Sequence, residues 1–119
     1  MEILFVEYPK CSTCQKAKKW LQEQGVSFTS RHMKEQNPTK EELKEWHQKS
    51  GLDIKRFFNT GGMIYREMKL KDRLPAMSLE EKYSLLSTDG MLVKRPILVT
   101  EQGIATGFRP EEWEKLLNV

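Results

Sequence analysis

A short apolar run at residues 3–6 is followed within a few positions by the only two cysteines of the chain, Cys11 and Cys14. A continuous apolar run of this length is typical of a strand that is buried on both faces. Residues 12–24 then have the pattern of a helix that ends at Gly25. This order of strand, cysteine pair and helix places Cys11 at a helix N-terminus, where unpaired backbone N–H groups stabilise an anion.

The spacing of the two cysteines favours redox chemistry. A Cys-X-X-Cys pair at a helix start lowers the pKa of its first thiol and makes that thiol a better nucleophile at neutral pH. Cys14 lies one turn further along the same helix face, close enough to form a disulfide with Cys11. A zinc site would need about two more ligands, but the remaining soft ligands are His32 and His47, far apart in the sequence. The alternative that stays open is a buried structural Cys14 beside an ordinary Cys11 thiol.

Length and composition limit the other function classes. A chain of 119 residues predicts a single domain spanning residues 1–119. Twenty Lys plus Arg against 17 Asp plus Glu give a net charge of +3, too weak to indicate nucleic-acid binding. No apolar run approaches the roughly 20 residues of a membrane span, and no signal-peptide pattern opens the chain. We therefore expect a cytoplasmic protein, in which a Cys-X-X-Cys pair is more often catalytic or sensory than a permanent cross-link.

The remaining elements predict an α/β fold. Residues 26–33 form a second predicted strand, and residues 97–100 and 104–106 form an antiparallel pair followed by a helix from Pro110. Capping boxes at Thr39 and Ser78 predict two helices, with Leu79 among the inward residues of the second. A further helix is expected over residues 63–70. Together these patterns predict a small mixed four-stranded sheet with a helical insertion, about residues 38–90, between strands two and three.

Two arginines precede prolines, at Arg95-Pro96 and Arg109-Pro110. The residue before a proline is restricted to extended conformations, so each arginine is held in a defined loop geometry. A guanidinium close to Cys11 would stabilise its thiolate or bind an oxyanion with two hydrogen bonds. Surface arginines in loops are the simpler interpretation when spacing alone is considered.

These motifs together resemble the thioredoxin-fold arsenate reductase (ArsC) family, which also includes the Spx-type redox regulators. The resemblance runs nearly end to end and rests on five segments: residues 8–14, 58–62, 65–67, 93–97 and 107–111. It implies a thioredoxin-like fold with Cys11 as nucleophile. It also implies that Arg95-Pro96 is a cis-proline loop facing Cys11 and that Arg109 lies near an oxyanion.

On this resemblance, Cys11, Cys14 and Arg95 are the expected catalytic residues, and a further set is expected to bind substrate: Lys10, Ser12, Thr13, Asn59, Pro96 and Arg109. Three residues of the glutathione-linked reductases, one histidine and two arginines, are absent from the matching positions of this chain. Glu7 and Tyr8 stand where those enzymes carry a histidine, and Gln15 and Asn59 stand where they carry arginines. Because each charged hydrogen bond contributes about 1.5–3 kcal/mol, these losses argue against efficient arsenate turnover.

The resemblance leaves two function classes. The first is a thiol–disulfide oxidoreductase that reduces a disulfide or a small oxyanion, with no bound cofactor and an external reductant such as glutathione, glutaredoxin or thioredoxin. The second is an Spx-type redox-sensing transcriptional regulator that binds the RNA polymerase α subunit. Gly51 lies in the segment where Spx-type proteins make that contact, although a helix C-cap is the simpler interpretation of this glycine.

Overall fold

The computed structural model describes residues 2–119. In chain order its helices and strands, with the 3₁₀ helices labelled η, are β1 (Ile3–Glu7), α1 (Ser12–Glu23), β2 (Thr29–His32), α2 (Lys40–Ser50), η1 (Ile54–Phe57), α3 (Met63–Glu67), α4 (Leu70–Arg73), η2 (Leu74–Ala76), α5 (Leu79–Leu86), η3 (Gly90–Leu92), β3 (Ile97–Thr100), β4 (Gly103–Thr106) and α6 (Pro110–Leu117).

The four strands form one mixed sheet in the order β2-β1-β3-β4. β1 pairs with β2 in parallel and with β3 in antiparallel, and β3 pairs with β4 in antiparallel. The central strand is therefore β1, which carries the chain directly to the cysteine pair. This arrangement confirms the predicted mixed sheet with its helical insertion between the second and third strands.

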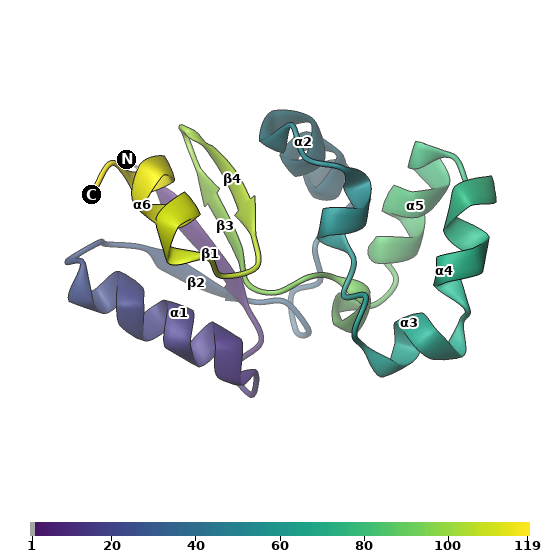
Figure 1. Cartoon of the computed structure of the whole chain (residues 1–119), viewed down its shortest axis with the longest axis horizontal. Coiled ribbons are helices and arrows are strands. Elements are labelled where there is room, and N and C mark those ends of the chain that lie inside the picture. Colours follow the sequence, from purple (N-terminus) through teal and green to yellow (C-terminus); the bar gives the residue numbers. More distant parts are fainter. Residues whose placement is uncertain (1) are drawn as a thin grey trace.

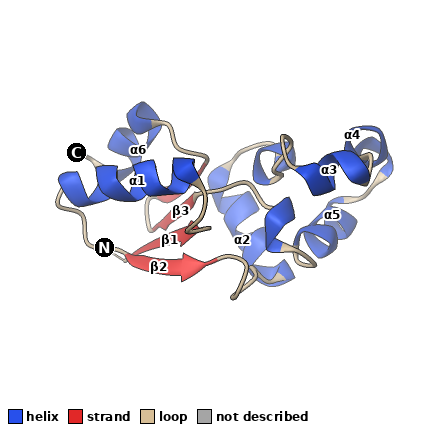
Figure 2. Ribbon diagram, turned by 90° about the horizontal axis from the view of Figure 1, so that it is seen from below, coloured by secondary structure: helices blue, strands red, loops and turns tan. Residues whose placement is uncertain are grey.

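Alternating side chains of β1 face two different cores. Phe5 packs with residues of α1 and α6, including Leu21 and Trp113. Val6 packs on the opposite face with residues of the insertion, among them Phe57. Figures 1 and 2 show α1 and α6 together on one face of the sheet, with α3, α4 and α5 grouped beyond one end of it. The molecule is correspondingly elongated, 42 × 27 × 24 Å.

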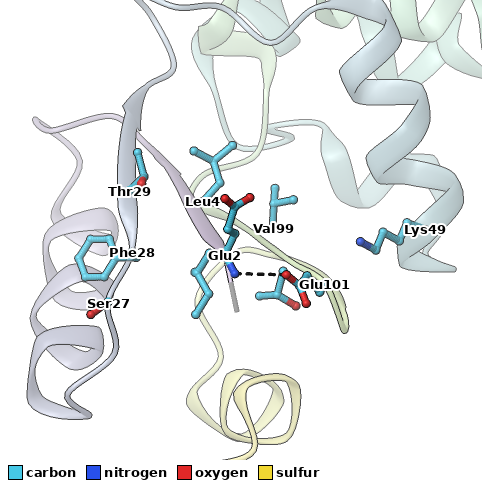
Figure 3. A pocket seen from close by; sticks show the side chains of 10 residues that line it. Glu2, Leu4, Ser27, Phe28, Thr29, Lys49, Val99 and Glu101 are labelled. Carbon is cyan, nitrogen blue, oxygen red and sulfur yellow. Dashed lines mark hydrogen bonds between the residues drawn. The ribbon is translucent and has the colours of Figure 1, made fainter.

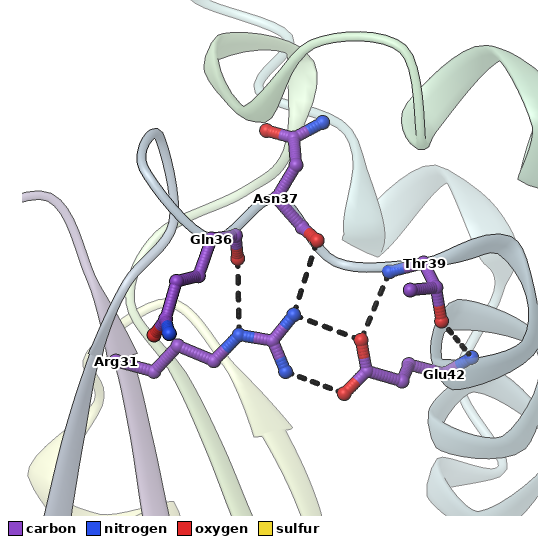
Figure 4. Close-up of polar contacts among 5 residues, drawn as sticks. All are labelled: Arg31, Gln36, Asn37, Thr39 and Glu42. Atoms are coloured by element: carbon purple, nitrogen blue, oxygen red, sulfur yellow. Dashed lines mark hydrogen bonds and ion pairs between the residues drawn. The ribbon is translucent and has the colours of Figure 1, made fainter.

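The insertion begins with a capped helix that is tied to the sheet. Thr39 and Glu42 form the expected capping box at the start of α2. The Glu42 carboxylate also receives two hydrogen bonds from the guanidinium of Arg31 in β2. The same guanidinium donates to the carbonyl oxygens of Gln36 and Asn37, both at 3.0 Å (Figure 4). The connection between β2 and α2 is thus fixed by side-chain contacts at both of its ends.

Three sequence-based expectations need correction. The second strand begins at Thr29, not at residue 26, because its pairing with β1 begins opposite Leu4 and the preceding Phe28 ring packs against Phe5, with ring centroids 5.6 Å apart. The helix expected over residues 63–70 ends at Glu67, and a separate helix begins at Leu70, because Lys69 between them adopts a left-handed conformation with φ 54°. Leu79, expected to face inward, is 48% exposed at the first turn of α5.

The second capping box is present, with Ser78 accepting from the Glu81 amide at the start of α5. Gly51 is the C-cap of α2 with φ 69°, a conformation that a residue with a Cβ rarely adopts. Nothing in the described part of the chain forms a helix long and apolar enough to cross a membrane.

Candidate redox site

Cys11 is the N-cap of α1, immediately after the loop that leaves β1. Its backbone is extended, with φ −85° and ψ 123°, and its amide donates to the Tyr8 carbonyl at 2.9 Å. The Cys11 carbonyl accepts the first intrahelical bond, from the Gln15 amide at 3.1 Å. No side chain caps the helix at Cys11, so its thiol lies among unpaired N–H groups of the first turn. This is the position that the sequence predicts for the nucleophile.

The two thiols have opposite environments. Burial alone raises the pKa of Cys11, but the backbone N–H groups of Cys14 and Thr13, the Cys14 thiol and the Arg95 guanidinium outweigh it and hold that pKa below the usual range. Burial raises the pKa of the Cys14 thiol to about 12, and the neighbouring Cys11 adds to this increase. Cys11 is half-buried, whereas the Cys14 side chain is inaccessible to solvent. The pair therefore consists of one accessible thiol that ionises readily and one hidden thiol that stays protonated.

Arg95 approaches the cysteine pair from the other half of the fold, on the loop before β3. The Arg95-Pro96 peptide bond is cis, as the resemblance implies. The guanidinium carbon lies 5.3 Å from the centroid of the Tyr8 ring, a cation–π contact, and Nη1 donates to the Met91 sulfur at 3.7 Å. These two contacts hold the charge of Arg95 beside Cys11.

A groove of about 660 Å³ opens at Cys11. One wall belongs to the insertion and comprises Asp53, Lys55, Arg56, Phe58, Asn59 and Thr60. The facing wall comes from the loop before β3 and the end of β4 and comprises Lys94, Arg95, Thr106, Gly107, Phe108 and Arg109. A pocket of this size suits a small-molecule ligand.

The groove is strongly cationic. Its lining has five basic side chains, at Lys55, Arg56, Lys94, Arg95 and Arg109, against the single acidic side chain of Asp53. Glu112 of α6 partly offsets this charge, with a carboxylate oxygen 3.4 Å from Arg109 and the other 3.9 Å from Arg56. The remaining positive field favours anionic ligands and the thiolate of Cys11.

The structure brings together only part of the expected site. Of the residues expected to bind substrate, Thr13, Asn59 and Arg109 line the groove with Cys11 and Arg95. Lys10 and Ser12 are exposed outside its lining, and Pro96 is buried. Cys14 lies beneath Cys11, buried in α1. The substrate-binding roles of the six residues expected to bind substrate stay predictions.

The positions that depart from the reductase pattern make structural contacts here. The buried Glu7 carboxylate lies 3.4 Å from the ammonium of Lys18 in α1. The Gln15 side chain donates to the Pro9 carbonyl at 2.9 Å, which ties the cysteine loop to the helix. Asn59 donates from its backbone N–H to the Leu92 carbonyl at 2.7 Å, which fixes the insertion wall of the groove.

Several residues of the groove were not among the expected site residues. On the insertion wall these include Lys55 and Arg56, and on the facing wall Lys94 and Thr106. Lys94 lies within the segment at residues 93–97 and Thr106 just before the segment at 107–111, and these motifs were the available signal, but only the fold shows that both residues line the cavity at Cys11.

A second hollow, of about 650 Å³, lies at the opposite end of β1 (Figure 3). It is lined near the start of β1 by Glu2, which donates its amide to the Glu101 carboxylate at 3.5 Å, and on the α2 side by Lys49. The hollow contains no thiol, so the groove at Cys11 is the candidate site. Within residues 2–119, no three His, Cys, Asp or Glu side chains are grouped so as to hold a metal ion.

Comparison with known proteins identifies relatives that align with nearly the whole chain. A crystal structure of an ArsC family related protein from Bacteroides fragilis is 57% identical, covers 98% of each chain and superposes with a TM-score of 0.94. The protein YusI of Bacillus subtilis (strain 168) is 50% identical over 115 residues, 97% of this chain and 98% of YusI. The regulatory protein MgsR of the same strain is 31% identical over 97% of this chain and 90% of its own length.

The thioredoxin-like fold implied by the resemblance is confirmed by solved structures of the same architecture. Residues 6–116 match the ArsC family as a whole. This match includes the cysteine pair, the insertion and both arginine loops, so the chain belongs to the ArsC family.

Proposed function

We propose that this protein is a thiol–disulfide oxidoreductase in which Cys11 is the nucleophile and Cys14 the resolving thiol. The observation that supports this most directly is the contrast between the thiols at the start of α1. Cys11 is accessible and has a lowered pKa, whereas Cys14 is buried and has a raised one. Such a pair separates the attacking role from the resolving role.

The reaction proceeds in two exchanges. The Cys11 thiolate attacks one sulfur of the substrate disulfide, which breaks that bond and releases the first thiolate. Cys14 then loses its proton and attacks the Cys11 sulfur of the mixed disulfide, which releases the second thiolate and leaves a Cys11–Cys14 disulfide. An external dithiol or two equivalents of a small thiol return the pair to the reduced state.

This cycle requires an external reductant such as glutathione, glutaredoxin or thioredoxin, which a reducing cytoplasm provides. A small oxyanion such as arsenate is a second substrate class for the cationic groove. Asn59 and Gln15 provide no charge at the two positions where the reductases carry arginines, so we expect disulfides to be turned over faster than arsenate.

The redox midpoint of the Cys11–Cys14 couple is the first test. We expect a reversible two-electron couple of about −200 to −270 mV when the protein is equilibrated in glutathione buffers and its alkylated thiols are counted by intact mass. In turnover assays, Cys11→Ser should abolish disulfide reduction and Cys14→Ser should accumulate the mixed disulfide. Equal residual activity of the two variants, or no intramolecular disulfide, would refute the division of roles.

The second candidate function is a redox-sensing regulator that binds the RNA polymerase α subunit. The similarity to MgsR, named a regulatory protein, favours it. The exposed C-cap Gly51 ends α2 in open space, with no atom within 4 Å of an added Cβ, so a partner could approach there. Co-purification with the α subunit that depends on the redox state of the pair, without disulfide turnover, would support the regulator and contradict the enzyme.

A further inference from the structure

The wall of the groove contains a buried hydroxyl without a partner. Thr106, the last residue of β4, is 1% exposed, and its Oγ1 is the only buried side-chain nitrogen or oxygen in residues 2–119 that makes no hydrogen bond. Its side chain follows Ile104 on the sheet face toward the insertion, and it lines the same cavity as Cys11. An unpaired buried hydroxyl destabilises a fold, so its position at this cavity calls for an explanation.

Thr100 shows that the same sheet can satisfy a buried threonine. Thr100 is 2% exposed, and its hydroxyl donates to the Gly103 carbonyl at 2.9 Å. The same oxygen accepts from the amides of Gln102 and Gly103, both at 3.1 Å. The two threonines are equally buried, and the one without a partner is the one that lines the groove.

The Lys94 side chain lies close to Gly107, the residue that follows Thr106. Gly107 has φ 74°, and a Cβ built on it would stand 3.1 Å from Cε and 4.0 Å from Nζ of Lys94. The flexible stem of Lys94 therefore lies against the residue that follows Thr106. Lys94 forms no ion pair with any of residues 2–119, unlike Arg56 and Arg109, which share Glu112.

We propose that Thr106 and Lys94 form a carboxylate-binding subsite beside Cys11, so that the disulfide reduced at Cys11 is that of a small thiol acid. This inference rests on the proposed function and names its substrate class. A hydroxyl and an ammonium are two donors that match the two oxygens of one carboxylate. Because the Thr106 hydroxyl is buried and the Lys94 stem lies against Gly107, the proposal requires that the Lys94 side chain shift when the carboxylate binds.

The subsite does not change the chemistry of the exchange. The Cys11 thiolate forms a bond to one sulfur, the substrate S–S bond breaks, and one equivalent of the thiol acid leaves as a thiolate that takes a proton from solvent. Thr106 and Lys94 hold the carboxylate of the half that stays bound to Cys11. They act on substrate choice and Arg95 acts on the thiolate, so the two effects are separable by mutation.

The test compares a charged with a neutral disulfide in the Cys14→Ser background, where the reaction stops at the mixed disulfide. The probes are 3,3′-dithiodipropionate, with two carboxylates, and bis(2-hydroxyethyl) disulfide, which has none. The measured quantity is the second-order rate constant for the dicarboxylate divided by that for the neutral disulfide. We expect Thr106→Val and Lys94→Gln each to lower this ratio about tenfold, as loss of one charged hydrogen bond predicts. Thr106→Ser, which keeps the hydroxyl, should retain the wild-type ratio to within about twofold.

Thermal unfolding provides an independent reading. Thr106→Val should raise the melting temperature, because it removes an unpaired buried hydroxyl. The matched control Thr100→Val should lower it, because it leaves the Gly103 carbonyl and two amides without their partner. A Thr106→Val variant with a raised melting temperature and an unchanged rate ratio would overturn the subsite, since the hydroxyl would then have no influence on substrate choice.

The subsite and the proposed function fail separately. If the Cys14→Ser protein reacts with neither disulfide, the redox function is wrong. Binding at the subsite is then tested with 3,3′-thiodipropionate, a thioether that carries the same two carboxylates but cannot be reduced. Amide NMR shifts at residues 106 and 107 that appear on titration and vanish in Thr106→Val would support the subsite, and their absence from the unsubstituted protein would overturn it.

Discussion

At the scale of single residues, the cysteine pair is made functional by its neighbours. The backbone N–H groups at the start of α1 act on Cys11 together with Arg95, whose charge arrives from a loop more than 80 residues away in the sequence. Tyr8 provides the ring against which that guanidinium lies. Removal of Arg95 should therefore change the ionisation of Cys11 without moving the helix that carries it.

We predict that Arg95→Met raises the pKa of Cys11. The guanidinium stabilises the thiolate, so its loss shifts ionisation to higher pH. The measurement is thiolate absorbance near 240 nm against pH, in the Cys14→Ser background so that one thiol is observed. Arg66→Met is the control, because Arg66 is exposed on α3 outside the groove. An identical titration curve for Arg95→Met and the unsubstituted protein would contradict the assignment.

The sequence was sufficient to locate Cys11, Cys14 and Arg95 because each belongs to a local pattern or to a family motif. Thr106 could not be found in the same way. Its hydroxyl matters because no partner reaches it, and this depends on how β4 packs against the insertion, which the strand sequence does not encode. The prediction that Leu79 faces inward was wrong for a similar reason. The helical pattern does not reveal which face of α5 the other helices of the insertion leave exposed.

At the scale of elements, β2 and α2 are joined by a bidentate ion pair between Arg31 and Glu42. The two side chains are 17% and 32% exposed, and the guanidinium also satisfies two loop carbonyls. The guanidinium holds the pKa of the Glu42 carboxyl below its usual range, and the Thr39 amide adds to this effect. The connection is therefore stabilised by charge as well as by packing.

We predict that Arg31→Met lowers the free energy of unfolding by about 1–3 kcal/mol at pH 7. Glu42 has a lowered folded pKa, so the pair's contribution is present above the unfolded pKa and is lost as pH falls through the folded pKa. Urea denaturation should show the variant and the unsubstituted protein converging in acid. The exposed pair of Lys44 and Glu80 is the control, and Lys44→Met should have little effect. A gap that stays constant down to low pH would contradict the role of the Glu42 charge.

The end of α2 offers a second element-scale prediction. Gly51→Ala should lower the free energy of unfolding by about 1 kcal/mol, because alanine is strained at φ 69°. No atom lies within 4 Å of the added Cβ, so backbone strain is the only source of the loss. Gly51→Asn, which tolerates the left-handed conformation better, should lose less in the same urea titration. Equal losses for both variants would show that strain is not the cause.

At the scale of the whole molecule, the two thiols should give the reduced protein a stability maximum in pH. The lowered pKa of Cys11 makes stability rise as pH passes through its folded value toward the ordinary thiol value. Cys14, with a pKa of about 12 in the fold, makes stability fall above the ordinary thiol value, because only the unfolded chain then releases that proton.

We predict that urea denaturation of the reduced protein from pH 5 to 10 shows this maximum and that each thiol accounts for one flank. Cys11→Ser should remove the rising flank, and Cys14→Ala should remove the falling one. A reduced protein whose stability is the same with and without Cys14 above pH 9 would contradict the buried environment of that thiol.

The groove between the sheet and the insertion has a consequence for how such proteins diversify. One wall is a single stretch of chain, residues 53–60, whereas the thiols and Arg95 belong to segments on either side of the insertion. Substitution of its exposed side chains, at Asp53, Lys55 and Thr60, would alter which molecules are admitted, while the backbone hydrogen bonds between this stretch and residues 92–94 stay in place. One wall of the groove can thus vary at its surface while the thiols and Arg95 stay unchanged, and exchanging these three side chains between family members would show how far that wall sets substrate choice.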